Sequence, residues 1–241
     1  MDNKILVIIP AYNEAPRIGT VIGGIQKELN NCDIVVINDA SKDDTASVAK
    51  EHHAHVITHP INLGYASAIQ TGYLYALHKG YEIIIQLDAD GQHLPREIHK
   101  LLRPIVDGSV DITFGSRYLE MDTYKTSFVK QFGQKSMAFV FYVITRKKIT
   151  DPTTGFSCLN KKCIHFFVEK YYPDKYPDVD VLIALYYSGL KMLEVPTQMN
   201  EREGGVSMHR GMSMFIYLIK MLLSIFYVIL NRNMFGEEIN D

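Results

Sequence analysis

Short apolar runs rich in β-branched residues alternate with segments of helical periodicity from residue 4 to residue 115, and this alternation constrains the fold more than any other feature. We expect strands at residues 4–9, 33–37, 55–58, 82–87 and 111–114, and helices at residues 17–29, 43–51, 66–79 and 95–106. Strands that alternate with helices pair in parallel, because each crossover helix returns the chain to the same edge. The pattern therefore predicts an α/β fold with a mostly parallel central sheet and helices on both faces.

Beyond residue 120 the pattern loosens. We expect helices at residues 128–144 and 181–187, a turn at residues 153–157 that leads into a strand, and a strand at residues 191–195. Ser41 is expected to cap the second helix, and Gly80 to end the third. No internal repeat or low-complexity linker divides the chain, so its length fits one large domain with a short appendage.

Composition excludes several classes of protein. Apolar residues make up 47% of the chain and charged residues 22%, as in ordinary globular proteins, so a large core needs no disulfide. The net charge of −2 provides no basic field for nucleic acid, which we do not expect as a partner. Cys32, Cys158 and Cys163 form no CxxC motif and are expected to be reduced, and residues 1–9 lack the features of a signal peptide. Both features predict a protein that faces the cytoplasm.

Polar clusters follow four of the expected strands at the points where those strands end. The clusters are residues 10–14, 38–41, 88–92 and 115–117. In open α/β sheets, ligands bind at the carboxyl ends of the strands, near the point where the strand order reverses. Four polar loops at this edge indicate a ligand site more strongly than any single motif does.

Asp88 and Asp90 directly follow the apolar run at residues 83–87. Carboxylates two positions apart after a strand can both turn toward one ion, and Gln92 can add an amide oxygen. Mg²⁺ and Mn²⁺ take such oxygen ligands and keep positions open for phosphate oxygens. An isolated Asp-x-Asp triplet is common and can be a plain polar turn, but its position after an apolar strand favours a site for Mg²⁺ or Mn²⁺.

The chain carries, in order, PAYNE at residues 10–14, VINDASKDDT at residues 36–45, NLG at residues 62–64 and DADGQH at residues 88–93. This set resembles the family 2 glycosyltransferases of the GT-A fold, over residues 4–210. The segments TGF and EVP, which begin at Thr154 and Glu194, extend the resemblance toward the polyprenyl-phosphate hexosyltransferases, the dolichol-phosphate mannose synthase group. The set is specific for fold and reaction class, and only weakly specific for the sugar and the acceptor.

The resemblance implies a nucleotide-sugar donor linked to UDP or GDP. It assigns Asp39 to the nucleobase, because a carboxylate accepts an N–H from uracil or guanine, and it assigns Tyr12 and Glu14 to the nucleoside. Gly64 would let the backbone and the start of the following helix approach the donor phosphates. Pro10 can alternatively serve only to shape its turn. The implied donor-binding residues are Pro10, Tyr12, Glu14, Asp39, Gly64, Asp88, Ala89, Ser207 and His209.

Arg117 resembles the family's phosphate-binding arginine, and Arg202 lies in a segment, residues 201–209, that resembles the family's mobile loop over the donor phosphates. Guanidinium groups match the geometry of phosphate oxygens. Each arginine can alternatively be a solvated surface charge. The family often has a lysine after the serine of this loop, where this chain has methionine. Either His209 or Arg210 could take the role of that lysine.

The resemblance also places an acidic residue opposite the acceptor. Asp180 fits this position best and Asp178 second, and Asp151 is a further candidate on the acceptor side. A sugar hydroxyl acceptor needs such a general base, whereas a phosphate acceptor is already anionic at neutral pH, since its second pKa is about 6. Either aspartate can alternatively cap a helix. The candidate catalytic residues are Asp88, Asp90, Asp178, Asp180, Arg117 and Arg202.

Residues 212–230 carry a single formal charge, that of Lys220, and would form an apolar helix with one narrow polar stripe. The stripe consists of Ser213, Tyr217, Lys220, Ser224 and Tyr227. Such a helix would rise about 28 Å, close to the thickness of the hydrocarbon layer. It can lie on a membrane, pack on a membrane partner or a second copy, or belong to the core, and we favour membrane association. We therefore expect a catalytic domain at residues 1–210 and a membrane-associating or partner-binding helix and tail at residues 211–241.

The sequence thus predicts an inverting, metal-dependent glycosyltransferase that uses a polyprenyl-phosphate acceptor at the cytoplasmic face of the membrane, where inversion is implied by the resemblance alone. Two alternatives remain, namely extension of a cell-surface glycan with Asp180 as base, and a non-catalytic nucleotide-sugar-binding scaffold subunit. A small membrane partner subunit or a homo-oligomer would fit the polar stripe. The histidine-rich stretch at residues 52–59 lacks helical metal-ligand spacing and is not expected to bind a metal.

Overall fold

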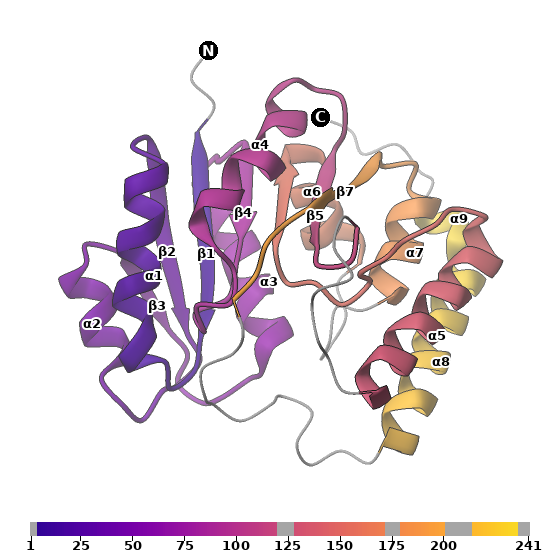
Figure 1. The fold of residues 1–241 in the computed structure, drawn as a ribbon, viewed down its shortest axis with the longest axis horizontal. Coiled ribbons are helices and arrows are strands. Elements are labelled where there is room, and N and C mark those ends of the chain that lie inside the picture. The colour runs from indigo at the N-terminus through magenta and orange to yellow at the C-terminus, as the bar shows by residue number, and fades with distance from the viewer. Residues whose placement is uncertain (1–3, 120–127, 172–178, 201–213, 236–241) are drawn as a thin grey trace.

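The computed structural model describes residues 4–119, 128–171, 179–200 and 214–235. These residues form a seven-stranded sheet in the order β3-β2-β1-β4-β6-β5-β7 (Figure 1). The strands are β1 (Ile5–Ala11), β2 (Cys32–Asn38), β3 (His55–Thr58), β4 (Ile83–Gln86), β5 (Ile112–Ser116), β6 (Ser157–Asn160) and β7 (Met192–Pro196). Only β6 runs antiparallel to its neighbours within this described sheet, so the expected mostly parallel arrangement is confirmed.

Helices cover both faces of the sheet, as the alternation of elements predicts. They are α1 (Ala15–Glu28), α2 (Thr45–Glu51), α3 (Tyr65–His78), α4 (Ile98–Val106), α5 (Phe128–Thr145), α6 (Lys161–His165), α7 (Val179–Tyr187), α8 (Met214–Leu230) and α9 (Arg232–Phe235), with short turns η1 (Pro95–Glu97) and η2 (Phe166–Lys170). Helices α1, α2 and α4 pack on one face, and α3, α6, η2 and α7 pack on the other. Figure 1 shows α5, α7 and α8 gathered on the β7 side of the molecule.

The central strand β1 shows why these strands are continuous apolar runs. Leu6 and Ile8 point into the core beneath α3, whereas Val7 and Ile9 point into the core beneath α1. All four side chains are buried. Because side chains alternate across a strand, a strand that is covered on both faces needs apolar residues at every position.

The third helix, α3, approaches β1 closely at Gly72. A Cβ atom added at Gly72 would lie 2.5 Å from Cγ2 of Ile8. The helix ends where the sequence predicts, since Gly80 has a left-handed φ of 70°. This close approach brings the first turns of α3 against the carboxyl ends of the central strands.

Two local predictions differ from the structure. Ser41 does not cap α2, because its Oγ accepts the N–H of Asn13 from the loop after β1, and the helix begins later, at Thr45. The helix expected at residues 95–106 is divided into η1 and α4. The strand β6 follows the turn that the sequence predicts, but it lies between β4 and β5 and reverses direction there.

The helix expected at residues 212–230 is present as α8, which packs on α7. Ile225 and Val228 are buried on the side toward the domain. Within the described ranges, no helix has the length and apolarity needed to cross a membrane. Cys32, Cys158 and Cys163, all within those ranges, are free thiols.

The packing of α3 on β1 predicts opposite effects for two glycine substitutions. Gly72→Ala forces a methyl group into the buried Ile8 side chain and should lower the free energy of unfolding by about 1–3 kcal/mol. Gly23→Ala in α1 meets no atom within 4 Å and should raise it by about 0.5–1 kcal/mol, because alanine favours the helix. Urea denaturation measures both, and equal stability of the two variants would contradict the close approach.

Candidate active site

The candidate site lies where the carboxyl ends of β1, β2 and β4 meet, at the lower edge of the sheet in Figure 1. Strand β1 pairs with β2 on one side and with β4 on the other, so the strand order reverses at β1. Ala11 pairs with Asn38, and the N–H of Asp39 donates to the carbonyl of Ala11 at 2.9 Å. The polar segments after these strands therefore converge at the switch point, where ligands bind in such sheets.

The loops after β1 and β2 are fastened to each other. The N–H of Asn13 donates to Oγ of Ser41 at 2.9 Å, and Oδ1 of Asn13 accepts the N–H of Lys42 at 2.8 Å. Asn13 and Ala40 both adopt left-handed backbone conformations, with φ of 56° and 58°. Pro10 lies inside β1, opposite Ile37. Asn13 thus shapes the turn.

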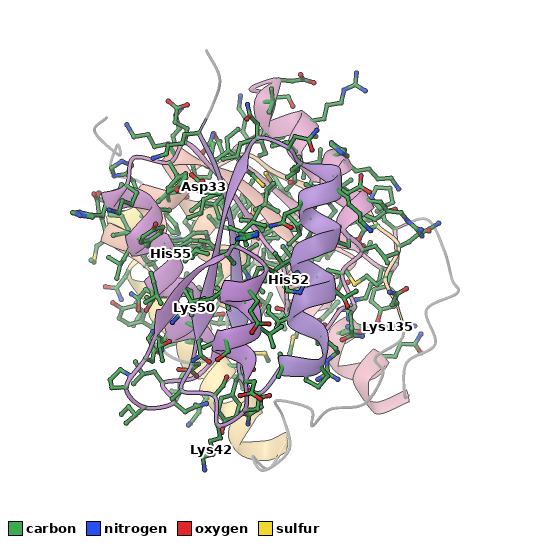
Figure 2. All side chains as sticks on the ribbon, turned by 90° about the vertical axis from the view of Figure 1, so that its left-hand side faces the viewer. Asp33, Lys42, Lys50, His52, His55 and Lys135 are labelled. Atoms are coloured by element: carbon green, nitrogen blue, oxygen red, sulfur yellow. The ribbon has the colours of Figure 1, made fainter. Side chains whose placement is uncertain are left out.

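Tyr12 and Glu14, both predicted to hold the nucleoside, have different surroundings. The Tyr12 side chain is 44% exposed, so its ring is open to a planar group at this edge. The Glu14 carboxylate accepts a hydrogen bond from Nε of Arg17 at 2.7 Å. The backbone N–H of Glu14 donates to Oγ1 of Thr45 at 2.8 Å. Figure 2 labels Lys42 at the same edge of the molecule.

The Asp39 carboxylate is buried and organises the segment before α3. Its Oδ1 lies 2.8 Å from Nδ1 of His59 and accepts the N–H of Leu63 at 2.8 Å. Its Oδ2 accepts the N–H of Gly64 at 2.8 Å. Gly64 has a φ of 95°, which glycine adopts without strain, and directly precedes α3. Asp39 therefore holds the loop that leads into the N-terminus of α3, a place suited to an anion.

Asp88 is connected to the core by a chain of hydrogen bonds. The Tyr65 hydroxyl donates to Oδ1 of Asp88 at 2.8 Å, and the Gln86 amide donates to that hydroxyl at 3.2 Å. The Tyr73 hydroxyl in turn donates to Oε1 of Gln86 at 2.7 Å. Donors that are aligned in this way polarise one another, so the chain fixes the orientation of the Asp88 carboxylate.

The backbone of the Asp88–Gln92 loop is held by its own side chains. The N–H of Asp88 donates to Nδ1 of His93 at 3.0 Å, and the His93 ring stacks on Phe156. Oδ1 of Asp90 accepts the N–H of Gln92 at 3.0 Å. Ala89, between the two aspartates, is buried in the core beneath α1. Asp88 and Asp90 are thus presented from a fixed turn after β4.

A divalent metal fits the residues at this turn. A Cβ atom at Gly155 would lie 2.7 Å from the Tyr65 hydroxyl oxygen and 3.0 Å and 3.1 Å from the two Asp88 carboxylate oxygens, so glycine lets the backbone approach this carboxylate closely. Asp88, Asp90 and Gln92 supply hard oxygen ligands, which suit Mg²⁺ and Mn²⁺. In the described part of the chain, no group of three or more His, Cys, Asp or Glu residues could hold a metal. Water and phosphate oxygens would complete the shell of an ion held here.

Burial raises the pKa of the Asp88 carboxyl above its usual range, and Asp90 adds to this increase. His93, the Tyr65 hydroxyl and Arg117 act in the opposite direction on the same pKa. The Asp88 side chain is still 26% exposed, so it remains accessible to an ion. Because a metal binds the carboxylate, protons compete with the metal at a higher pH than at an ordinary aspartate.

Arg117 follows β5 and pairs with Asp151. Its Nε lies 2.6 Å and its Nη2 lies 2.7 Å from the two Asp151 oxygens, and Nη2 also donates to Oγ1 of Thr153 at 3.2 Å. Asp151 is fully buried, and its N–H donates to Glu194 at 2.8 Å. Burial raises the pKa of the Glu194 carboxyl. Asp151 therefore orients Arg117, whose positive charge acts to lower the pKa of Asp88, and the expected position of Asp151 toward the acceptor stays a prediction.

Asp180 lies on α7 and is buried against α8. Its Oδ2 accepts from the Tyr171 hydroxyl at 2.8 Å and from the Ser224 hydroxyl at 2.5 Å. Burial and the neighbouring Asp180 raise the pKa of the Tyr171 hydroxyl. These contacts give Asp180 a part in attaching α8 to the domain, while its role as a general base stays a prediction.

Several predicted site residues cannot be placed. Asp178, Arg202, Ser207 and His209 lie outside the described residues. The histidines of residues 52–59 have different surroundings, since the His55 ring stacks on Tyr75 whereas the His59 ring bonds to Asp39. Figure 2 labels His52 and His55 at different places. The expectation that this stretch forms no metal site stays a prediction.

The structure adds residues that sequence reasoning did not select. They are Tyr65, His59, His93, Gln86 and Gly155. Tyr65 directly follows the NLG motif, and His93 and Gly155 lie within the DADGQH and TGF motifs, so their positions were a usable signal. His59 was grouped with the other histidines, and only its burial and its bond to Asp39 separate it from them.

Comparisons with known proteins identify the family and several relatives of the chain. A family model described as Glycosyl transferase family 2 matches residues 6–167. The chain is 29% identical to UDP-N-acetylglucosamine–dolichyl-phosphate N-acetylglucosaminyltransferase of Methanococcus voltae, over 89% of this chain and 92% of that protein. It is 28% identical to polyprenol monophosphomannose synthase of Mycolicibacterium smegmatis, over 86% of this chain and 82% of that protein.

A solved structure shares the fold. Glucosyl-3-phosphoglycerate synthase from Mycobacterium tuberculosis, in complex with Mn²⁺ and uridine-diphosphate-glucose, matches with a TM-score of 0.67 and 17% identity. The match covers 96% of this chain and 79% of that one. At this identity the likeness establishes the architecture of the chain.

Removing the Tyr65 hydroxyl should weaken metal binding in a pH-dependent way. Tyr65→Phe takes a donor from the ionised Asp88 and so raises the Asp88 pKa further, which favours the proton over the metal. We expect Mn²⁺ affinity to fall by up to about tenfold near about pH 6, and less near about pH 8. Calorimetric titration measures this, with Tyr75→Phe on the same helix as control. An equal loss of Mn²⁺ affinity at both pH values would contradict the proposed effect of the Tyr65 hydroxyl on the pKa of Asp88.

Proposed function

The chain belongs to glycosyl transferase family 2 and is a glycosyltransferase of the GT-A fold, and from this premise we propose that it transfers a sugar from a nucleotide-sugar donor to a polyprenyl phosphate. The transfer is metal-dependent and inverts the configuration at the sugar. The observation that carries this proposal is the pair Asp88 and Asp90, presented from a fixed turn at the switch point of the sheet beside Gly155.

Different residues of the site bind different parts of the donor. Asp88 and Asp90, with Gln92, hold Mg²⁺ or Mn²⁺, which when bound neutralises charge on the departing diphosphate. Arg117, oriented by Asp151, donates to a phosphate oxygen. The nucleoside lies at the ends of β1 and β2, with its base between the exposed ring of Tyr12 and the carboxylate of Asp39.

A phosphate acceptor agrees with the surroundings of Asp180. A sugar hydroxyl must lose a proton to a base as it attacks, whereas a phosphate oxygen is already anionic at neutral pH. The Asp180 carboxylate is buried and occupied by the hydroxyls of Tyr171 and Ser224. Two relatives of the chain are named for dolichyl phosphate and for polyprenol monophosphomannose, which supports the same acceptor class.

The outward face of α8 supports a place at the membrane surface. Leu223 is 62% exposed and Phe226 is 59% exposed, and further exposed apolar residues continue this face. The remaining members on α8 are Leu222, Tyr227 and Leu230, and Met234 on α9 is exposed as well. The polar stripe is partly turned inward, since Ser224 bonds to Asp180, while Lys220 is exposed. We therefore place this face in the interface of the cytoplasmic leaflet, where a lipid acceptor diffuses.

Loss of one metal carboxylate should abolish transfer without unfolding the chain. Asp90→Asn removes a charged ligand that stabilises the leaving diphosphate, so transfer should fall by more than about a hundredfold. Radiolabelled transfer from UDP- and GDP-sugars to lipid phosphate, with Mn²⁺ or Mg²⁺, measures this. Asp107→Asn, an exposed site at the end of α4, is the matched control. Near-normal turnover of Asp90→Asn at saturating metal would contradict the assignment of Asp90 as a metal ligand.

The α8 face predicts a loss of membrane binding when charge is added to it. Leu223→Glu with Phe226→Glu should weaken liposome binding by about tenfold or more, because two exposed apolar side chains no longer enter the interface. Transfer to long-chain lipid phosphate in liposomes should fall with it, while slow donor hydrolysis persists. Liposome flotation and both assays measure this, with Leu74→Glu on α3 as control. If the wild-type chain does not bind liposomes, and transfers sugar to water-soluble acceptors as well as to lipid phosphate, the glycan acceptor is favoured.

A further inference from the structure

The contacts of Asp39 limit what its carboxylate can still accept. Nδ1 of His59 and the N–H groups of Leu63 and Gly64 all approach it at 2.8 Å. A carboxylate oxygen carries no hydrogen, so Nδ1 of His59 is the donor in its contact. Two of these donors share Oδ1, and the third, from Gly64, uses Oδ2.

A carboxylate has about four accepting positions, two on each oxygen. Oδ1 of Asp39 is therefore filled by His59 and Leu63, whereas Oδ2 retains one position beside the bond from Gly64. Any ligand that reaches this carboxylate is offered a single accepting position.

His59 is fixed in place from three sides. Its Nε2 lies 2.9 Å from Oγ1 of Thr71, and the Thr71 hydroxyl donates to the carbonyl of Ser67 at 2.9 Å. Its backbone N–H donates to the carbonyl of Asn38 at 2.9 Å. The side chain is buried, so it cannot leave Asp39 without breaking these contacts and leaving polar groups without partners.

Nucleobases differ in the donors that they present to such a carboxylate. Uracil presents one ring N–H between two carbonyl groups. Guanine presents a ring N–H and an adjacent amino group, and this pair of donors fits the two oxygens of one carboxylate side by side. Cytosine has no ring N–H on the corresponding edge. With Oδ1 filled, guanine would leave one buried donor without a partner, which costs affinity, whereas uracil is satisfied by Oδ2.

We infer that His59 is a specificity-determining residue, which fills Oδ1 of Asp39 so that the site takes a uracil-type nucleotide donor and rejects a guanine-type donor. This inference rests on the proposed function, in which Asp39 receives the base of the nucleotide-sugar. It adds the class of base, which the position of Asp39 alone leaves open.

The first test uses the unaltered full chain. Calorimetric titration with UDP, GDP and CDP in the presence of Mg²⁺ should give a dissociation constant for UDP that is lower than the other two by about tenfold or more. CDP differs from UDP at the donor position while its ring size is the same. Equal or tighter binding of GDP overturns the inference and leaves the proposed glycosyltransferase function standing. Failure to bind any of the three nucleotides overturns the proposed function itself.

The second test compares two substitutions of His59. His59→Leu removes the N–H at Oδ1 and opens a second accepting position, so the preference for UDP over GDP should shrink by about fivefold or more. His59→Gln keeps an N–H donor at this place and should retain the preference. A purely structural defect weakens all nucleotides together and leaves their ratio unchanged. A His59→Leu variant that folds and keeps the wild-type ratio therefore overturns the role of His59.

Discussion

Strand β1 pairs in parallel with both β2 and β4, and the geometry of the whole site depends on this double pairing. Neighbouring strands lie about 4.8 Å apart, so the residues that follow them are set side by side. The end of β2 contributes the carboxylate of Asp39, and the end of β4 contributes those of Asp88 and Asp90. Because β1 is buried on both faces, neither half can shift without disturbing the core.

Helix α3 supports both halves of the site from beneath. Tyr65 in its first turn bonds to Asp88, whereas Thr71 further along bonds to His59, which bonds to Asp39. The helix reaches this position because Gly72 lets it lie against Ile8 of β1. The proposed metal-binding and base-binding carboxylates are therefore oriented by one rigid element, an arrangement that preorganises a site before its ligand arrives.

The carboxylates of the chain are divided between structure and chemistry. Asp151 holds Arg117, Glu194 holds the segment that bears Asp151, and Asp180 joins α7 to α8. Buried charges of this kind persist because each is paired or hydrogen-bonded. Asp88 and Asp90 differ, since they follow β4 at the switch point of the sheet and are the proposed metal ligands. The sequence also marked Asp151 and Asp180 as candidate site residues, and only the structure shows the partners of each.

The sequence by itself determined most of the strands and helices, and it indicated Asp88 and Asp90 as the proposed metal pair. The apolar run at residues 83–87 predicts a buried strand. Asp88 and Asp90, which follow it directly, mark the polar end of that strand. The mostly parallel sheet followed from the alternation of strands and helices, and the family from its motifs. These features are encoded within a few residues of one another, where periodicity and turn chemistry act.

Only the tertiary structure decided the direction of β6 and the partners of the polar side chains. Period-two alternation is the same in parallel and antiparallel strands, so the insertion of β6 between β4 and β5 left no mark on its sequence. Ser41 turned to Asn13 instead of capping α2, and Asp180 turned to Ser224, which lies 44 positions away. His59 became the partner of Asp39 because parallel pairing brings the ends of β2 and β3 together. Hydrogen bonds of this kind depend on which groups the fold places within about 3 Å, and local periodicity carries no information about that distance.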